Sequence, residues 1–372
     1  MPDVATPRLG LQLAERLAER IRAIDAEGLR RTLRPPAGID LCSNDYLGLA
    51  EHPLLKRRMA DAVMAEGVGS TGSRLLRGER TNFARVEERF ARFKGVERSL
   101  YFSSGYLANL AVLTTFPEAG DTIYCDERNH ASLIDGARLS RARRVVFPHS
   151  DTAALAKLLR EDDSIGQKFV VFESLFSMDG DRAPLADYAA LCRAAGAELI
   201  VDEAHAVGVY GTHGAGLAGD VFVSINTAGK AMGVSGAFVA GSTDAIEYLI
   251  QRARPFIFST APPPAIAAAL EASLEVIVNE PERRERLLVR ARYLRERLGL
   301  AGESPIIPII IGENQRAVAI ASKMQAAGFD VRAIRPPTVP PGTARLRVTV
   351  NQGLSEDVLD RFVEALAAAK KE

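Results

Sequence analysis

The sequence is poor in several residue types, and each shortage excludes a class of protein. It has no tryptophan, three cysteines and five histidines in 372 residues. Cys42, Cys125 and Cys192 lie far apart and are odd in number, so they predict reduced thiols rather than a disulfide or zinc framework. The histidines show no metal-ligand spacing, and no metal site is expected.

An excess of charge of either sign is also missing. The 47 basic residues balance the 47 acidic ones, which favours neither nucleic acid nor an anionic membrane as a partner. No apolar run approaches the ~18 residues of a membrane span, and the first ten residues lack the basic-then-apolar pattern of a signal peptide. We therefore expect a cytoplasmic protein.

Lysine is scarce, with eight lysines against 39 arginines. One of them, Lys230, lies in a small-residue loop between two apolar, β-branched runs, among Ala228, Gly229, Ala231 and Gly233. Such surroundings are poorly hydrated and give a planar group room to approach. Because desolvation disfavours the ammonium form, a lysine here is expected to be nucleophilic and suited to imine chemistry. A surface lysine on a glycine-rich loop explains this stretch alone equally well.

From residue 83 to residue 241, apolar strands alternate with amphipathic helices. Strands are predicted at the start of 99–109, over 121–127 and 143–148, within 168–181, where the strand runs into an acidic turn, and over 197–205. This alternation predicts an α/β protein with a mostly parallel sheet covered on both faces, and ligands bind such sheets beyond the carboxyl ends of the strands. Polar residues directly follow the apolar runs: Ser104, His130, Ser177, Asp202, His205 and Thr227.

Further helices flank this region. An amphipathic helix with Leu13, Leu17, Ile21 and Ile24 on one side is predicted within 11–33 and should end at Gly28. Other helices are predicted at 54–66, 265–278, 281–299, 315–327 and 355–369, with strands at 306–311 and 346–350. We expect an N-terminal helix and arm over 1–40, a large domain over 41–250 and a small C-terminal α/β domain over 251–372.

Asp202 and Lys230 form the core of the expected site. Asp202 ends a buried strand, where an unpaired carboxylate is costly, so it should face a cation, either a protonated pyridine nitrogen or an arginine. His205 adds an aromatic ring, and Lys230 adds an amine. These are the groups that pyridoxal 5'-phosphate (PLP) requires. The predicted helix N-terminus at Ser104–Tyr106, together with Thr227, would meet its phosphate.

Nine motifs together resemble the α-oxoamine synthases, PLP-dependent enzymes of the aspartate aminotransferase fold (fold type I). They are S-N-D-Y-L-G-L at 43–49, G-S-T-G-S at 69–73, S-S-G-Y-L-A-N at 103–109, N-H-A-S-L at 129–133, F-S-M-D-G-D at 176–181, V-D-E-A-H at 201–205, T-A-G-K-A-M-G-V-S-G at 227–236, F-S-T at 258–260 and A-I-R-P-P-T-V-P-P-G-T-A-R-L-R at 333–347. The resemblance implies a large PLP-binding domain, a smaller C-terminal domain, and a decarboxylating condensation of an amino acid with an acyl thioester. The R-P-P-T form favours the branch of the family that joins L-alanine to a pimeloyl thioester, of CoA or acyl carrier protein, in biotin biosynthesis.

The resemblance also implies a role for single residues around the cofactor ring. Lys230 would bond to the cofactor's aldehyde, and Asp202 would pair with the ring nitrogen. His130 would stack on the ring and also matches a catalytic, substrate-contacting position, while His205 would contact the ring hydroxyl. The remaining cofactor-binding residues implied are Gly105, Tyr106, Ser177 and Thr227.

Four further residues are implied at the substrate and between subunits. Thr260 would reach the phosphate held by the partner subunit, which implies a homodimer with shared active sites. Arg347 would take the amino-acid carboxylate, since a guanidinium fork suits that group. Arg30 and Thr338 match substrate positions, with the adjacent Arg31 as an alternative to Arg30.

The chain departs from the family pattern at four places: S-I-N-T-A-G-K before Lys230, Ala206, Arg77, and N-Q-G at 351–353. These changes bear on acyl-chain contacts rather than on the cofactor.

Two alternative functions stay open. One is a sister synthase that uses glycine with acetyl-CoA or succinyl-CoA, such as a glycine C-acetyltransferase, or serine with a long-chain acyl-CoA. The other is an inactive scaffold or a cofactor-binding regulator built on the same fold.

Overall fold

The computed structural model describes residues 11–371, which group into two compact units. The larger unit comprises Ser43–Ile306 and Thr349–Glu356. The smaller unit comprises the described residues through Cys42, Ile307–Val348 and the described residues from Asp357 on. Residues 251–306 therefore group with the larger unit, and the domain boundaries expected at residues 40 and 250 stay predictions.

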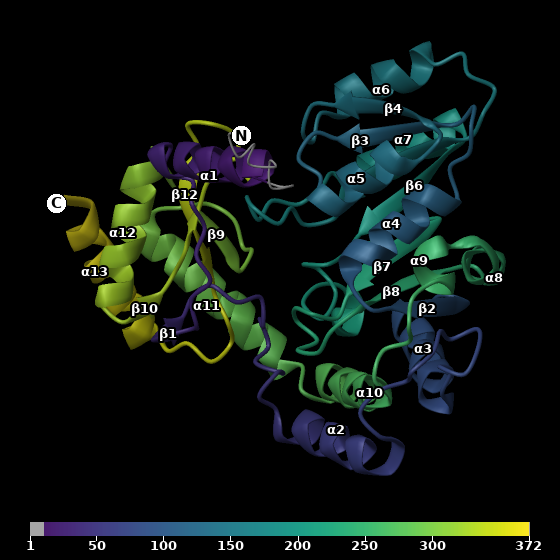
Figure 1. The fold of residues 1–372 in the computed structure, drawn as a ribbon, viewed down its shortest axis with the longest axis horizontal. Coiled ribbons are helices and arrows are strands. Elements are labelled where there is room, and N and C mark those ends of the chain that lie inside the picture. The colour runs from purple at the N-terminus through teal and green to yellow at the C-terminus, as the bar shows by residue number, and fades with distance from the viewer. Residues whose placement is uncertain (1–10, 372) are drawn as a thin grey trace, which may run out of the picture. The chain divides into compact units, whose positions relative to one another are not determined.

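A seven-stranded sheet forms the centre of the larger unit (Figure 1). Its strand order is β2-β8-β7-β6-β5-β3-β4. Neighbouring strands are parallel except at β8, which runs antiparallel to both β2 and β7. This confirms the expected mostly parallel α/β sheet. The strands are β2 (Arg98–Phe102), β3 (Thr122–Asp126), β4 (Arg143–Phe147), β5 (Lys168–Glu173), β6 (Ala197–Asp202), β7 (Val223–Thr227) and β8 (Ala237–Gly241).

Helices cover both faces of this sheet because successive strand residues point to opposite sides. In β2, Leu100 and Phe102 join the apolar cluster under α4 (Gly105–Thr115), α5 (Ala131–Leu139) and α8 (Thr243–Arg252), whereas Tyr101 stacks on Phe83 of α3 (Thr81–Lys94). The short helix α9 (Arg254–Ile257) lies with α4, while α6 (Thr152–Glu161) and α7 (Leu185–Ala195) contribute to a second cluster with Tyr124 and Phe172. The unit also contains α2 (Pro53–Glu66), which packs on α10 (Pro264–Asn279), the 3-10 turn Thr212–Gly214, and α11 (Glu282–Leu298).

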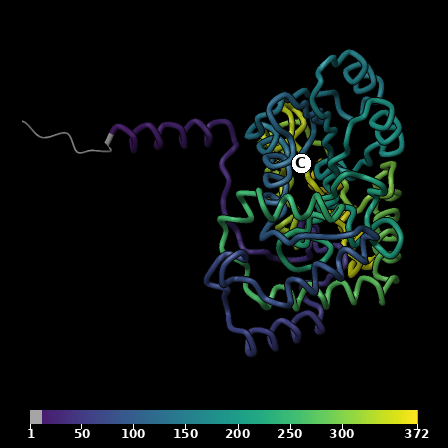
Figure 2. The backbone as a smooth tube through the Cα atoms, turned by 90° about the vertical axis from the view of Figure 1, so that its right-hand side faces the viewer, coloured from purple at the N-terminus to yellow at the C-terminus, as the bar shows by residue number. Residues whose placement is uncertain are grey.

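The smaller unit is assembled from segments far apart in the sequence. β1 (Ile39–Asp40) pairs in parallel with β10 (Phe329–Asp330), and a second sheet has the order β11-β12-β9. Its strands are β9 (Ile306–Gly312), β11 (Ala333–Ile334) and β12 (Ala344–Thr349), and its helices are α1 (Leu11–Ala26), α12 (Asn314–Ala326) and α13 (Glu356–Lys371). Helix α1, purple in Figure 2, is followed by Gly28 with a φ of +65°. Its apolar stripe of Leu13, Leu17, Ile21 and Ile24 is exposed.

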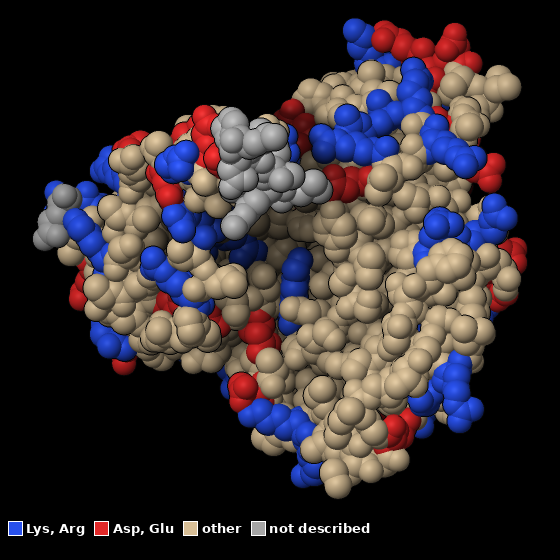
Figure 3. Space-filling view, viewed as in Figure 1, with Lys and Arg blue, Asp and Glu red and all other residues tan. Residues whose placement is uncertain are grey.

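The surface agrees with the balanced composition. On the face in Figure 3, acidic and basic side chains are interspersed among other residues. Cys125 and Cys192 are buried, and burial raises the pKa of each thiol to about 12. Within residues 11–371, no helix combines the length and the apolarity that crossing a bilayer requires. Over the same residues, no group of three or more His, Cys, Asp or Glu side chains is arranged to hold a metal ion.

Candidate active site

The carboxyl edge of the seven-stranded sheet gathers most of the predicted site residues. Parallel strands end at the same edge, so the residues that follow β2, β3, β5, β6 and β7 are brought together. The residues placed there are Gly105, Tyr106, His130, Ser177, Asp202, His205, Thr227 and Lys230.

Lys230 lies in the tight connection between β7 and β8. Its Nζ is 2.8 Å from Nε2 of His205, and Nδ1 of His205 is 2.6 Å from the hydroxyl of Tyr46. His205 and Tyr46 are buried, and Lys230 is half-buried. The amine therefore belongs to a hydrogen-bonded series, Tyr46–His205–Lys230, rather than extending into solvent as a surface lysine would.

The small residues around Lys230 have two different causes. Gly233 has a φ of +68°, and a Cβ there would lie 2.5 Å from the backbone nitrogen of Ala50. Gly233 is thus required by the protein's own backbone rather than by a ligand, contrary to the expectation from the sequence. At Gly229, by contrast, a Cβ would meet nothing closer than Thr227 Cγ2 at 3.9 Å, an ordinary van der Waals contact, so the protein's own packing does not require glycine there.

Asp202 ends β6 in a buried position, directly opposite Glu173 in the pairing of β5 with β6. Its Oδ2 accepts a 2.7 Å hydrogen bond from the side-chain amide of Asn109, and its Oδ1 accepts one of 2.9 Å from the backbone of Ala204. The neutral amide orients the carboxylate without neutralising it. Of the two cations considered from the sequence, this arrangement favours a ring nitrogen over an arginine.

Glu173 is a second buried carboxyl group at the same edge. Its Oε2 accepts a hydrogen bond of 3.1 Å from the backbone of Ser177, whereas its Oε1 is buried without a hydrogen-bond partner in the described structure. Burial, and then the charge of Asp202, raise the pKa of Glu173 to about 8, although Lys230 opposes this shift. The facing pair therefore retains a proton at neutral pH.

His130 is the N-cap of α5. Its Nδ1 accepts a 3.2 Å hydrogen bond from the backbone of Ser132. Desolvation of the ring lowers the pKa of His130, and Lys230 lowers it further, while Asp202 acts in the opposite direction. A neutral imidazole fixed in this way suits stacking against a flat ring. Capping α5 and stacking on a ring are therefore compatible roles for His130.

An anion cradle lies at the N-terminus of α4. The Ser104 hydroxyl accepts a hydrogen bond of 3.2 Å from the backbone of Leu107, and the first N–H groups of α4 have no acceptor within the helix. A Cβ at Gly105 would lie 2.5 Å from Oγ1 of Thr227, so only glycine lets that hydroxyl approach the helix terminus. The Tyr106 ring is exposed, and its hydroxyl donates to Asp135. Phosphate fits such a terminus.

The groups at this edge have the chemistry that PLP requires. The buried carboxylates suit its ring nitrogen, the amine suits its aldehyde, and the N-terminus of α4 suits its phosphate. The orphaned Oε1 of Glu173 and the tight approach at Gly105 are features of a site built around a polar ligand.

The other predicted residues lie elsewhere. Thr260 is exposed, and its backbone pairs with that of Ser73 in the larger unit. In the smaller unit, Arg30 and Thr338 line one cavity of about 320 Å³ together with Arg31. Arg30 also forms a 2.7 Å ion pair with Asp25. Arg347 is buried in β12.

Three residues of the edge were not singled out from the sequence. Glu173 carries the same signal as Asp202, an acid at the end of an apolar strand. Asn109 lies one helical turn after Gly105 in the quoted motif, which places it over the sheet. Tyr46 gives no such signal, because its contact with His205 spans 159 positions of sequence.

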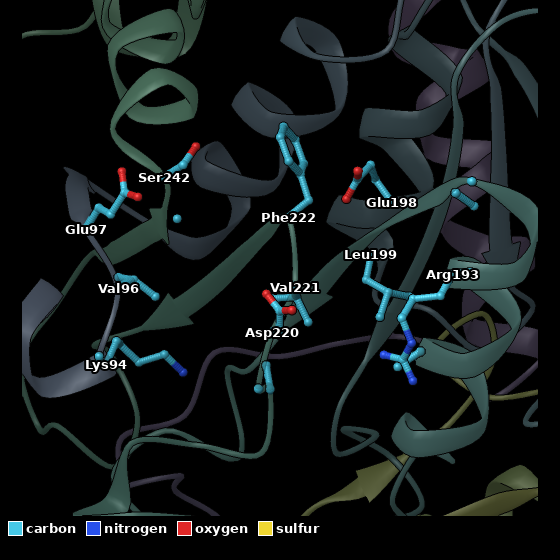
Figure 4. Close-up of a pocket in the computed structure, with 18 residues that line it drawn as sticks. Lys94, Val96, Glu97, Arg193, Glu198, Leu199, Asp220, Val221, Phe222 and Ser242 are labelled. Atoms are coloured by element: carbon cyan, nitrogen blue, oxygen red, sulfur yellow. The ribbon is translucent and has the colours of Figure 1, made fainter.

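A large cavity of about 850 Å³ lies at the opposite edge of the sheet (Figure 4). It is lined by residues before β2, β6 and β7, with Lys94 and Arg193 on either side of Asp220. Lys94 is engaged in a buried 2.6 Å ion pair with Glu203. This cavity contains none of the predicted residues, so size alone does not locate the site.

Comparison with known proteins agrees with this geometry. Residues 36–366 match the family model for aminotransferase class I and II. The chain is 44% identical to the 8-amino-7-oxononanoate synthase of Geobacter sulfurreducens, covering 96% of this chain and 98% of that one, and 46% identical to that of Anaeromyxobacter dehalogenans, covering 94% of each.

Among solved structures, the serine palmitoyltransferase of Sphingomonas wittichii superposes with a TM-score of 0.90 at 30% identity, covering 98% of both chains. An 8-amino-7-oxononanoate synthase from Francisella tularensis gives 0.77 at 30% identity, covering 90% of this chain and 98% of that one. A serine palmitoyltransferase from S. paucimobilis, with a TM-score of 0.89, 28% identity and 98% coverage of both chains, was solved with a bound PLP–myriocin aldimine. The match over most of its length establishes that the chain belongs to the aminotransferase class I and II family.

Proposed function

We propose that this chain is a PLP-dependent 8-amino-7-oxononanoate synthase. It joins L-alanine to a pimeloyl thioester, of CoA or acyl carrier protein, and releases carbon dioxide, the free thiol and 8-amino-7-oxononanoate for biotin biosynthesis. The observation that carries the proposal is the sheet edge that holds Lys230, His205 and the buried Asp202, in a chain 44–46% identical to curated synthases of that name.

The residues at this edge divide the work around the cofactor. Lys230 would supply the amine that bonds to the aldehyde, and Asp202, whose carboxylate accepts a hydrogen bond from Asn109, would pair with the ring nitrogen. The α4 terminus and Thr227 would hold the phosphate, Ser177 would help to hold the cofactor, and His130 would stack on the ring. When bound, PLP supplies an aldehyde carbon and a protonated ring that accepts electron density from the bond broken at Cα.

Lys230 also moves the proton. The Lys230 amine would be the base that takes the proton from Cα of alanine and the acid that returns a proton to the product carbon. His205, hydrogen-bonded to Lys230 at 2.8 Å, aims the amine and is itself held by Tyr46. The buried carboxylate of Asp202 would keep the ring nitrogen protonated, because a buried negative charge without a cation beside it is unfavourable.

Recognition of the substrates is assigned to the smaller unit. Arg347 binds the amino-acid carboxylate. Arg30 and Thr338 share their cavity with Arg31 and Arg335, and burial, then Arg31, lower the pKa of Arg335. Such a crowded set of guanidinium groups favours an anion, and the distal carboxylate of a pimeloyl chain has the right charge.

A homodimer with shared sites is part of the proposal, as is a cytoplasmic location. Thr260 lies on a loop whose neighbours expose large apolar side chains, and the Ser73–Thr260 bridge and an Ala261-to-Gly72 hydrogen bond of 2.8 Å tie this loop to residues 67–78. The exposed side chains are Val68, Leu75, Leu76 and Phe258. An apolar patch of this kind fits a second copy of the chain.

Product analysis tests the activity. The purified protein is incubated with PLP, L-alanine and either pimeloyl-CoA or pimeloyl acyl carrier protein, and the product is identified by mass spectrometry. The expected product is 8-amino-7-oxononanoate. Matched incubations contain glycine with acetyl-CoA and serine with palmitoyl-CoA. Product from only one of those pairs would reassign the chain to a sister synthase, and no product from any pair would favour the inactive scaffold.

A further inference from the structure

His149 is not among the residues assigned to the site, yet it lies at the same edge of the sheet, just after β4. Its Nδ1 is 2.9 Å from Oδ1 of Asp126, which ends β3, and its Nε2 is 2.8 Å from Oδ2 of Asp181. Both partners are carboxylates, which only accept hydrogen bonds. A neutral imidazole has a single N–H, so satisfying both contacts requires the doubly protonated ring.

The surroundings of His149 stabilise that cation. Asp126 is buried, and its carboxylate also accepts backbone hydrogen bonds of 2.9 Å from Arg128 and from Ser150. Although burial acts against the charge, the hydrogen bonds to Asp126 and Asp181 raise the pKa of His149 to about 9. The other titratable groups that face this cluster are Tyr188 of α7, Asp151 at the start of α6, and the Arg128–Asp179 ion pair at 3.1 Å.

Asp181 depends on His149 in return. Its Oδ1 is buried without a hydrogen-bond partner in the described structure, so His149 supplies the hydrogen bond to its Oδ2. Burial would raise the pKa of Asp181, but His149 outweighs that effect and the pKa is lowered. If the imidazolium were lost, two carboxylates would face each other across a neutral ring.

The loop that contains Asp181 also contains Ser177. The backbone N–H of Phe176 donates to the carbonyl of Asp181, and that of Gly180 donates to the carbonyl of Phe176, both at 2.9 Å. The Phe176 ring meets the imidazole of His149 edge-on, with centroids 4.3 Å apart. His149 therefore contacts both ends of the segment 176–181.

The same loop is joined to the cofactor carboxyl groups. The N–H of Ser177 donates to Glu173, and the N–H of Ser174 donates to the backbone carbonyl of Asp202 at 2.9 Å. A shift of Asp181 would thus move Ser177 relative to Glu173 and Asp202. We propose that His149, as an imidazolium held between Asp126 and Asp181, is a positioning residue that fixes the 174–183 loop and so places Ser177 for the cofactor.

This inference rests on the cofactor role proposed for Ser177, but its first test needs neither cofactor nor activity. Hydrogen exchange of the cofactor-free protein is followed by mass spectrometry in the wild type, His149→Gln, Asp181→Asn and the double variant. Each single variant is expected to speed exchange in the 174–183 peptide by roughly tenfold, as loss of a charge-assisted hydrogen bond predicts. The double variant should be no worse than either single one, because both break the same contact.

The matched control is His52→Gln. His52 pairs with Glu280 at 3.4 Å, caps α2 and lies outside the sheet edge. The His52→Gln variant should leave exchange of the 174–183 peptide unchanged. PLP titrations supply the second readout: His149→Gln and Asp181→Asn should weaken PLP binding by roughly tenfold at about pH 7, and His52→Gln should not.

The pH dependence of hydrogen exchange tests whether protection of the loop requires the charged form of His149. In the wild type the loop should be protected below about pH 8 and lose protection as the pH rises through 9, after correction for intrinsic exchange, while His149→Gln should lack this step. Unchanged loop exchange in Asp181→Asn, or exchange that rises equally in β5 and β6, would overturn the inference. If His149→Gln does not fold, exchange of the 174–183 peptide in Asp181→Asn is sufficient to test the inference. A failed product assay with intact loop effects would contradict the proposed function instead.

Discussion

Glu173 and Asp202 face each other across the pairing of β5 with β6, and both are buried. One of them holds a proton at neutral pH, and the raised pKa of Glu173, about 8, assigns that proton to Glu173. The proton limits the negative charge at this edge of the sheet in the cofactor-free protein. Lys230 lies close enough for its charge to oppose this rise in the pKa of Glu173.

Stability of the cofactor-free protein should report this proton. The pKa of Glu173 is raised from 4.5 to about 8, so the native state binds more protons than the unfolded chain between these values. The free energy of unfolding should therefore fall as the pH rises through that window. Glu173→Gln, which stays neutral, should flatten this fall. Denaturant unfolding of both proteins at several pH values measures it, and identical slopes would contradict the assignment.

Elements with a clear period were predictable from the sequence, and contacts between distant elements were not. Apolar runs located β3, β5 and β6, and the small-residue turn located the start of α4. The antiparallel direction of β8 follows from the short connection around Lys230, whose hydrogen bonds close a hairpin between Ala228 and Gly236. The requirement for glycine at position 233 comes from Leu49 and Ala50, which are far away in the sequence, so the local sequence around Lys230 does not reveal it.

The proposed phosphate site at the N-terminus of α4 can be tested with a single substitution in that helix. Gly105→Ala should preserve the helix, since alanine is a good helix former, but its Cβ would lie 2.5 Å from Oγ1 of Thr227. We expect PLP to bind at least roughly tenfold more weakly, by absorbance titration, with little change in thermal stability.

A matched variant separates a clash from a loss of helix. Gly95→Ala introduces alanine at a C-cap where nothing lies within 4 Å of the new Cβ, although its φ of +70° is strained. That variant should lose stability and keep PLP affinity. The opposite pattern in either variant would argue against a phosphate site at α4.

The whole molecule was the hardest scale to predict. The smaller unit combines β1 with β10, segments almost three hundred positions apart, and periodicity within a segment gives no sign of such pairing. Arg30 and Thr338 meet in one cavity for the same reason. Motif resemblance named both residues, whereas their proximity required the fold.

Subunit mixing tests shared active sites. Lys230→Ala and Thr260→Glu should each be inactive alone, the second because a carboxylate repels phosphate. If Thr260 acts in the partner's site, co-expressed variants form heterodimers with one wild-type site each. An equal mixture should then regain about a quarter of wild-type activity.

The matched control mixes Lys230→Ala with Asp202→Asn, which alter the same subunit's own site, and it should regain nothing. Full activity of Thr260→Glu alone, or no recovery in the first mixture, would contradict the shared site.

The most direct measurement concerns Lys230 itself. The protein is loaded with PLP, reduced with borohydride, digested and mapped by mass spectrometry, with Lys230→Ala treated in parallel. We predict a pyridoxyl group on Lys230 alone among the eight lysines, and none in the variant. An unlabelled Lys230, or a label on another lysine with Lys230 untouched, would contradict the account.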